Sequence, residues 1–309
     1  MNLTNPIFTD ENKAREHFEA IRWPDGPYCP HCGETEKVYR LNGKSHRDGL
    51  LHCNGCNEAF TVTVGTVMER SHVPLNKWAL AFRLLCSSKK GMSAHQLHRT
   101  LDVTYKTAWF MAHRIREAMR PLADDGQLGG ANKVVEIDET YVGGKARNRK
   151  NHVPPKEAVV ALVERDGRVR SHHVPSVNGT TLKPILKAEI SKASYVMTDE
   201  STVYPPITGE FSGHGTVNHS IEEYVRGHFW HTNTVESYFS ILKRGVIGTY
   251  HHVSAEHLKR YLGEFDFRHN ERIALGVNDT ERTAKAIKGA SGKRLTYQQA
   301  GRGSAAVPF

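Results

Sequence analysis

The chain has 309 residues, of which 38% are hydrophobic and 24% charged, which is typical of a globular protein with room for two or three domains. No stretch approaches the roughly eighteen apolar residues of a membrane span, and the N-terminus lacks the pattern of a signal peptide, so we expect a cytoplasmic protein without membrane association. The net charge of +9 favours a polyanionic partner, most simply nucleic acid.

Two cysteine pairs follow a short helix predicted within residues 1–25. YCPHCG contains Cys29 and Cys32, and CNGC contains Cys53 and Cys56 after a spacer of twenty residues. This spacing is typical of a four-thiolate zinc site, whereas the alternative of two disulfides is disfavoured in a reducing cytoplasm. The alternating segments VYRLNG and AFTVTVGTVM indicate strands, so we predict a zinc ribbon over residues 26–70. Four thiolates leave no open coordination position, so its zinc is structural.

The region 71–122 reads as three helices. SAHQLHRTL and YKTAWFMAHRIREAM are joined by a short turn at Asp102 and Val103, which matches a helix-turn-helix. The third helix would then read DNA, presenting Lys106, Thr107, His113, Arg114 and Arg116. The alternative is a plain helical hairpin with a solvated basic face.

After a turn-rich linker at residues 123–132, the pattern changes to strands within a domain predicted at residues 133–288. We expect a strand at 133–144, a hairpin at 157–174, a helix at 180–190, strands at 194–200 and 215–220, and helices at 231–245 and 253–270. A loop before the hairpin concentrates positive charge that would hold DNA backbone, at Lys145, Arg147, Arg149 and Lys150. The small, polar segment 289–309 is expected to be loosely ordered.

This order of elements predicts an α/β fold whose mixed sheet is flanked by helices. Asp138 lies in the middle of the first strand and Asp199 at the end of the fourth, and these two strands can be neighbours. A helix packed across that edge can deliver Glu236 as a third acid. A buried Asp in mid-strand is costly unless it is paired or metal-bound, which points to function for Asp138.

The helix at 231–245 has an apolar stripe that includes Val235 and Leu242. A neighbouring stripe carries Glu236 and Lys243 about 10 Å apart, and Arg244 follows, which suggests a site for both metal and phosphate. Two structural alternatives remain open. Asn233 and Glu236 also form a capping-box pattern, and Asp199 could cap the helix that follows it.

Three carboxylates suit the chemistry of phosphodiester displacement. Two Mg²⁺ (or Mn²⁺) ions about 3.5–4 Å apart can activate the attacking oxygen and stabilise the leaving oxygen, and Mg²⁺ prefers hard oxygen ligands. Glu136 and Glu139 are rivals of Asp138 for this role, and Glu200 is a rival of Asp199.

The whole pattern resembles the ISXO-type group of bacterial insertion-sequence transposases. The resemblance rests on the zinc ribbon, the helix-turn-helix, EIDETYVGGK, VMTDES, HTNTVESYFSILKRGVIGTYHHVS, HLKRYLGEFDFRHNER and GKRLTY. It implies a ribonuclease-H-like catalytic domain with a DDE triad, whose acids fall on Asp138, Asp199 and Glu236. The family's basic residue falls on Lys243, and Asn233 is the second choice for the third ligand.

The resemblance further implies a Mg²⁺-dependent transposase that cleaves and transfers DNA strands in association with the bacterial nucleoid. The zinc ribbon and helix-turn-helix would bind terminal inverted repeats, Lys243 and Arg244 would contact DNA, and a homo-oligomer would pair the two ends. A DNA-binding regulator with an inactive catalytic domain and a nuclease or resolvase of the same fold are the alternatives.

Overall fold

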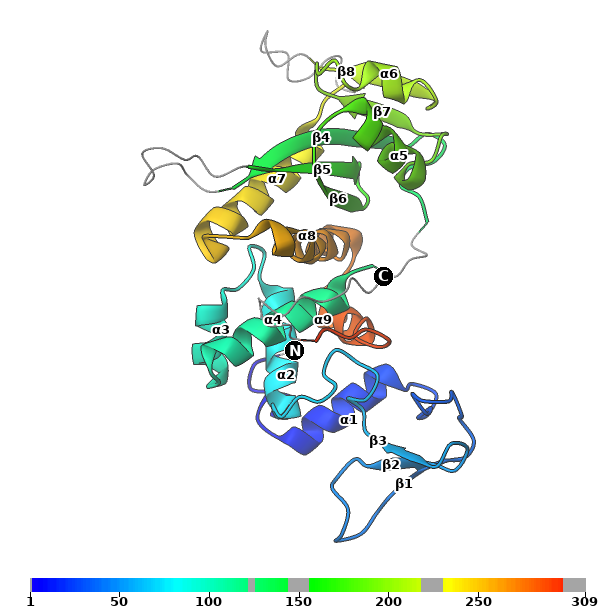
Figure 1. Ribbon diagram of the computed structural model, residues 1–309, viewed down its shortest axis with the longest axis vertical. Coiled ribbons are helices and arrows are strands. Elements are labelled where there is room, and N and C mark those ends of the chain that lie inside the picture. Colours follow the sequence, from blue (N-terminus) through cyan, green and yellow to red (C-terminus); the bar gives the residue numbers. More distant parts are fainter. Residues whose placement is uncertain (1, 122–125, 144–155, 218–229, 297–309) are drawn as a thin grey trace, which may run out of the picture. The chain divides into compact units, whose positions relative to one another are not determined.

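The structure is a computed structural model that describes residues 2–121, 126–143, 156–217 and 230–296 (Figure 1). The chain forms two compact units. Unit 1 comprises residues 83–93 and 119–285, and unit 2 comprises residues 2–82, 94–118 and 286 onward. The division falls inside the region 71–122 that was predicted as one helical domain.

Unit 2 begins with helix α1 (Glu11–Arg22), after a short 3-10 turn. Asp10 caps α1, because its side chain accepts the N–H groups of Asn12 at 2.8 Å and Lys13 at 3.1 Å. A three-stranded antiparallel sheet follows, made of β1 (Val38–Arg40), β2 (Leu51–Cys53) and β3 (Glu58–Phe60) in that order. The predicted ribbon is thus confirmed, although its last strand ends at Phe60 and the chain turns from there on.

The three helices predicted after the ribbon are present as α2 (Leu75–Ser87), α3 (Ala94–Leu101) and α4 (Tyr105–Met119). The Thr104 hydroxyl accepts the N–H of Thr107 at 3.2 Å, which caps the start of α4 as predicted. Leu97 and Leu101 of α3 are buried, as are Ala108 and Ile115 of α4. The helical hairpin therefore forms through the apolar periodicity visible in the sequence.

Unit 1 contains a five-stranded mixed sheet in the order β6-β5-β4-β7-β8. The β6-β5 and β5-β4 pairs are antiparallel, and the β4-β7 and β7-β8 pairs are parallel. This is the predicted ribonuclease-H-like arrangement, with the first and fourth strands of the domain as neighbours. The strands are β4 (Val134–Val142), β5 (Glu157–Glu164), β6 (Val169–Val174), β7 (Tyr195–Thr198) and β8 (Gly213–Thr216), and the helices are α5 (Gly179–Glu189), α6 (Pro205–Thr208), α7 (Asn233–Gly245) and α8 (Ala255–Asn270). Helix α9 (Asp279–Lys288) begins in unit 1 and ends in unit 2.

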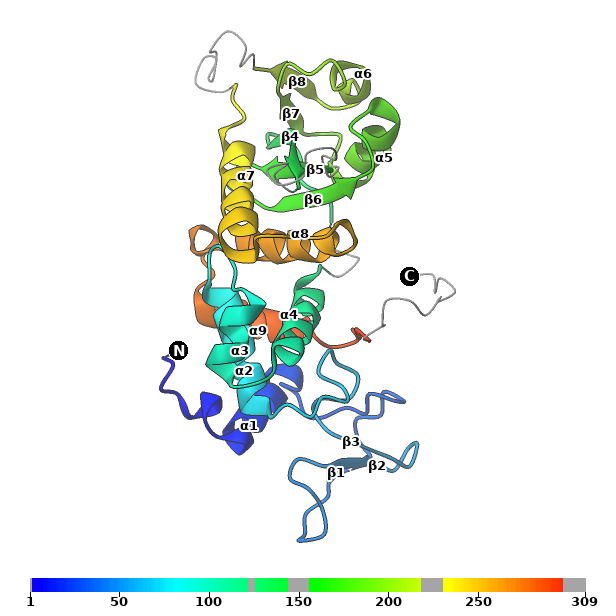
Figure 2. The same cartoon turned by 60° about the vertical axis from the view of Figure 1, so that its left-hand side comes forward.

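Helices cover both faces of this sheet (Figures 1 and 2). Alternate residues of β5 divide between two cores: Val159, Ala161 and Val163 pack with α7 and α8, whereas Val160 and Leu162 pack with α5 and α6. Each fully buried Val or Leu side chain contributes about 1.5–3 kcal/mol. A strand that is apolar on both sides is expected when helices cover both faces of a sheet.

A buried polar network joins α7 to α8 and β6. The Asp266 carboxylate of α8 accepts hydrogen bonds from the Tyr238 hydroxyl of α7 and from the N–H and hydroxyl of Ser171 on β6. Burial raises the pKa of Asp266 to about 6. These bonds fix α7 against the sheet in addition to its apolar stripe.

The segment predicted as loosely ordered is anchored at its start. Ser291 forms an antiparallel bridge with Thr66, and the Ala290 carbonyl accepts the N–H of Val67 at 3.1 Å. Gly292 donates its N–H to the carbonyl of Gly65 at 2.9 Å. Residues 290–292 therefore pair with residues 65–67 of the same unit, whereas residues 297–309 lie outside the described part.

Candidate functional site

The strand register brings the two predicted aspartates to one level of the sheet. The last pair of the parallel β4–β7 ladder is Glu136 with Met197, and Asp138 and Asp199 each follow two residues beyond it, at the same end of the two strands. Asp138 lies within β4, and Asp199 directly follows the end of β7. Both side chains are half-buried. The topology inferred from the sequence therefore holds for this pair.

The surroundings of Asp138 oppose the ionisation of its carboxyl group. Burial raises its pKa to about 7, and the negative charges of Asp199, Glu139 and Glu236 add to the increase. The N–H of Glu139, which donates to Asp138 Oδ1 at 2.7 Å, acts in the opposite direction. A cluster of acids of this kind is one that a divalent cation would stabilise.

Helix α7 carries Glu236, the predicted third acid. Its apolar stripe of Val235, Phe239 and Leu242 is buried against the sheet, as predicted. Glu236 and Lys243 lie on the exposed side, in the first and last turns respectively. Glu236 Oε1 accepts a hydrogen bond from the Thr232 hydroxyl at 3.0 Å.

The capping box predicted from Asn233 and Glu236 does not form. The N-cap of α7 is Thr232, and Asn233 is the exposed first residue of the helix. The N–H groups of Thr234 and Val235 instead donate to the carboxylate of Glu136, at 2.8 and 3.0 Å. An acid from a distant strand thus caps this helix.

Asp199 does not cap the helix that follows it, which was the other structural alternative. Helix α6 begins at Pro205 with Tyr204 as its N-cap. Asp199 Oδ1 accepts the N–H of Ser201 at 3.1 Å, which closes a local turn after β7.

The two acids that flank Asp138 on β4 already have partners. Both oxygens of Glu136 accept hydrogen bonds from α7 or Arg165, and its side chain is 0% exposed. Glu139 accepts a hydrogen bond from the buried hydroxyl of Tyr204, and burial raises the pKa of Glu139. These contacts leave Asp138 as the acid of β4 best placed to bind a cation.

Among the residues that the structure describes, one group of His, Cys, Asp or Glu side chains converges closely enough to bind an ion, and it consists of Cys29, Cys32, Cys53 and Cys56. Asp199 and Glu236 influence the charge state of Asp138, but the three carboxylates do not converge in this way. The side chains of the predicted triad are thus neighbours, but they do not lie as close together as ligands of one ion.

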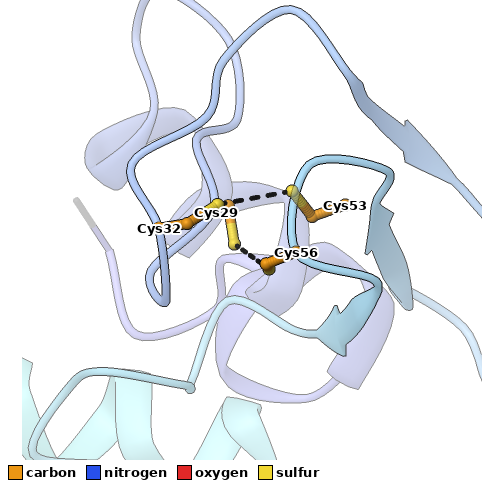
Figure 3. A group of neighbouring side chains, drawn as sticks. All are labelled: Cys29, Cys32, Cys53 and Cys56. Atoms are coloured by element: carbon orange, nitrogen blue, oxygen red, sulfur yellow. Dashed lines mark hydrogen bonds between the residues drawn. The ribbon is translucent and has the colours of Figure 1, made fainter.

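The four cysteines fit tetrahedral zinc (Figure 3). Their sulfur atoms all lie within 4.8 Å of one another, and the Cys29–Cys56 and Cys32–Cys53 pairs are both separated by 3.6 Å. Tetrahedral Zn²⁺ with Zn–S bonds of about 2.3 Å sets sulfurs about 3.8 Å apart. Two knuckles supply the ligands, and Cys53 ends β2. The predicted fifth, separate cysteine, Cys86, is buried in α2.

The predicted DNA contacts of α4 need correction. Lys106 is exposed near the start of the helix, but Arg116 is 2% exposed and His113 is fully buried, so neither presents its side chain on a DNA-facing surface. Arg114 is half-buried, with its guanidinium 4.5 Å from the Phe110 ring and bonded to the carbonyl of Glu69 at 3.1 Å. In the C-terminal half of α4, these basic side chains lie on the same side of the helix as buried apolar residues, so they are buried or half-buried as well.

Four of the remaining predicted DNA contacts lie outside the described residues: Lys145, Arg147, Arg149 and Lys150. Arg244 is exposed on α7 and bonds to Ser240 of the preceding turn, at 3.1 Å to the carbonyl and 2.9 Å to the hydroxyl.

A cluster of aromatic rings at the surface was not predicted from the sequence. The rings of His95 and Tyr105 stack at 4.4 Å, His98 lies 6.3 Å from Tyr105, and Tyr105 is 45% exposed beside Lys106. The signal in the sequence was the i, i+3 spacing of the two histidines, but their contact with the next helix required the hairpin geometry.

Comparison with known proteins identifies the family of the chain. Residues 127–270 match the family described as the ISXO2-like transposase domain, and residues 9–59 match the transposase zinc-ribbon domain. A protein of Halobacterium salinarum, described as an uncharacterized protein in transposable element ISH50, is 30% identical over 285 residues, which cover 84% of this chain and 91% of the relative. The chain belongs to the IS1595 family of insertion-sequence transposases. The resemblance predicted from the sequence motifs is therefore confirmed.

Both predicted sites lie inside the segments that match this transposase family. Asp138, Asp199, Glu236 and Lys243 fall within the ISXO2-like transposase domain, and the four cysteines fall within the zinc-ribbon domain. No helix among the described residues of this transposase is both long enough and apolar enough to cross a membrane.

Proposed function

We propose that this IS1595-family member catalyses metal-dependent cleavage and strand transfer of DNA at the ends of an insertion sequence. The observation that carries the proposal is the position of Asp138, held within β4 beside the strand that leads to Asp199 and close enough to Glu236 for that charge to oppose its ionisation. Three acids from two strands and a helix, within a family of transposases, suit a site for divalent cations and phosphodiester chemistry.

Asp138, Asp199 and Glu236 would hold the ions through carboxylate oxygens, the ligand type that Mg²⁺ prefers. Bound Mg²⁺ would activate the attacking oxygen and stabilise the leaving oxygen. The half-buried setting of Asp138 and Asp199 would limit competition from bulk water. Lys243, exposed on α7, would contact a DNA phosphate as a point charge.

DNA would be bound by residues near the start of α4 and by the zinc ribbon. The N-terminal residues of a recognition helix are the ones that reach base edges, and Lys106 is exposed there beside Tyr105. Arg244 and the basic residues Lys145, Arg147, Arg149 and Lys150 would contact the DNA backbone. Because both ends of an element are joined to one target, at least two copies would act together in the DNA complex.

The test is cleavage and joining of an oligonucleotide duplex that carries the element's terminal inverted repeat, in Mg²⁺. The wild-type protein should nick the end and join the freed 3′-hydroxyl to target DNA, and Asp138→Asn should lose both activities while still binding the end. Full activity of Asp138→Asn would refute the assignment. Binding without metal-dependent nicking would indicate a regulator, and cleavage without joining would indicate a nuclease or resolvase.

The same assay decides between the candidates for the third ligand. Glu236→Gln should abolish cleavage, whereas Asn233→Ala should retain it. The reverse result would assign the third position to Asn233.

A further inference from the structure

We propose that Glu136 is a positioning residue that holds the first turn of α7, and with it Glu236, against the strand that carries Asp138. The inference rests on the proposed function, because it assumes that Glu236 and Asp138 act in one site. Glu136 lies two residues before Asp138 on β4, and its side chain faces the same side of the sheet.

Glu136 replaces the missing hydrogen-bond partners at the start of α7. Its Oε2 accepts the N–H groups of Thr234 at 2.8 Å and Val235 at 3.0 Å, and its Oε1 accepts the Thr234 hydroxyl at 3.0 Å. The first N–H groups of a helix have no partner within the helix, and a negative charge there is stabilised by the helix dipole. These bonds join residues almost one hundred positions apart in the chain.

Arg165 completes the arrangement from the turn after β5. Its Nε donates to Glu136 Oε1 at 2.6 Å, and its Nη2 donates to the carbonyl of His231 at 2.8 Å, just before α7. Its backbone N–H donates to the carbonyl of Val134 at the start of β4. A fully buried carboxylate requires such a counter-charge. Arg165 therefore ties the entrance of β4 to the segment that enters α7.

Glu136 would influence the proposed metal site through the residues to which it is hydrogen-bonded. Its oxygens are directed at Thr234, Val235 and Arg165, so it has a different task from the proposed ligands. Glu236 directly follows Val235, and its Oε1 is oriented by the Thr232 hydroxyl of the same turn. The position of this first turn therefore sets the position of Glu236 relative to Asp138. Groups that orient metal ligands typically change metal affinity or activity 10–100-fold when mutated.

The experiment compares Glu136→Gln with the wild-type full-length protein bound to its DNA end. Gln keeps the volume but puts an NH₂ group where one oxygen accepts donors, so the first turn of α7 loses part of its anchor. Two readouts are needed: the Mg²⁺ dependence of single-turnover cleavage, and the affinity for Mn²⁺ measured by electron paramagnetic resonance. We expect a decrease of roughly 10–100-fold in Mn²⁺ affinity or in the cleavage rate at saturating DNA, with unchanged DNA affinity.

Two further variants separate positioning from general destabilisation. Glu189→Gln is the matched control, because Glu189 pairs with Arg170 in the same unit but contacts neither β4 nor α7 in this network, and its Mn²⁺ affinity should equal that of the wild type. Thr234→Val removes one of the bonds to Glu136 and leaves the carboxylate in place. It should move Mn²⁺ affinity in the same direction by a smaller factor, and it decides the question if Glu136→Gln does not fold.

A double variant distinguishes the failure of this inference from failure of the proposed function. If Glu136 acts through Glu236, then Glu136→Gln should cause no further loss of Mn²⁺ affinity in a Glu236→Gln background. An equal loss in both backgrounds, or wild-type Mn²⁺ affinity in folded Glu136→Gln and Thr234→Val, would overturn the positioning role alone. If Glu236→Gln itself changed neither cleavage nor Mn²⁺ affinity, the proposed catalytic assignment would fall as well.

Discussion

Replacing Asp138 by Asn is expected to stabilise the folded protein in the absence of divalent cations, although the same change should abolish catalysis. Burial, and then the charges of Asp199, Glu139 and Glu236, raise the pKa of Asp138 from 3.8 to about 7. The folded state therefore holds a proton that the unfolded chain releases between pH 4 and 7. Asn removes this cost of ionisation, and its Oδ1 can still accept the N–H of Glu139.

The magnitude follows from the size of the pKa shift. A shift of about three units corresponds to about 4 kcal/mol, which is an upper bound because the site relaxes when it ionises. Because the pKa is raised on folding, the unfolded state binds fewer protons over this range, and the stability of the wild-type protein falls as pH rises from 4 to 7. The part of this change between about pH 5.5 and 8, where zinc stays bound to thiolates, is about 2 kcal/mol.

The assay is urea unfolding of zinc-loaded wild-type and Asp138→Asn proteins across that pH range without Mg²⁺. The difference in unfolding free energy between the two proteins should grow with pH up to about 7 and then level off. Asp266 titrates in both proteins and cancels in the difference, which therefore reports Asp138 together with its coupling to the neighbouring carboxylates. Added Mg²⁺ should stabilise the wild type more than the variant. The reasoning is refuted if Asp138→Asn is the less stable protein at pH 8, or if the difference does not depend on pH.

Three other changes probe the ribbon, the core and the DNA surface. Cys53→Ser should lose the bound zinc and the fold of the ribbon, whereas the control Cys86→Ala should keep its zinc. Metal content and circular dichroism measure the two effects. A full equivalent of zinc in Cys53→Ser would contradict the four-thiolate site. Leu242→Ala should lower the unfolding free energy by about 2–5 kcal/mol, against less than about 0.5 kcal/mol for the exposed Ser240→Ala, and equal losses would argue against a buried stripe on α7. Lys106→Ala should weaken DNA binding and reduce the salt dependence by about one counterion, measured by fluorescence anisotropy at several salt concentrations, and an unchanged slope would remove Lys106 from the contact surface.

Local patterns in the sequence were enough to predict much of the fold. The spacing of the cysteines fixed the zinc centre, because each CxxC knuckle is a local structure. Apolar periodicity located α4 and α7, and the alternation of strands and helices placed Asp138 next to Asp199. These features depend on neighbours along the chain or on the few topologies that a mixed sheet allows.

Long-range contacts account for what the sequence did not reveal. Asn233, a neighbour in sequence, was one candidate for the cap of α7, but Glu136 supplies the cap from β4. Arg116 looked like a DNA ligand because it is basic, and it is buried because of the helix face on which it lies. Capping and surface exposure both depend on which elements meet in space, and residue type alone does not specify that.

The pairing of residues 290–292 with residues 65–67 has a consequence for the order in which the protein is made. The ribbon and its adjoining helices are synthesised first, yet their unit includes a bridge from Ser291 to Thr66 and a hydrogen bond from the Lys293 ammonium to the carbonyl of Ala118. On the ribosome, the intervening strands and helices of unit 1 leave the exit tunnel before this partner segment does. The unit that is translated first is therefore the one that is completed last.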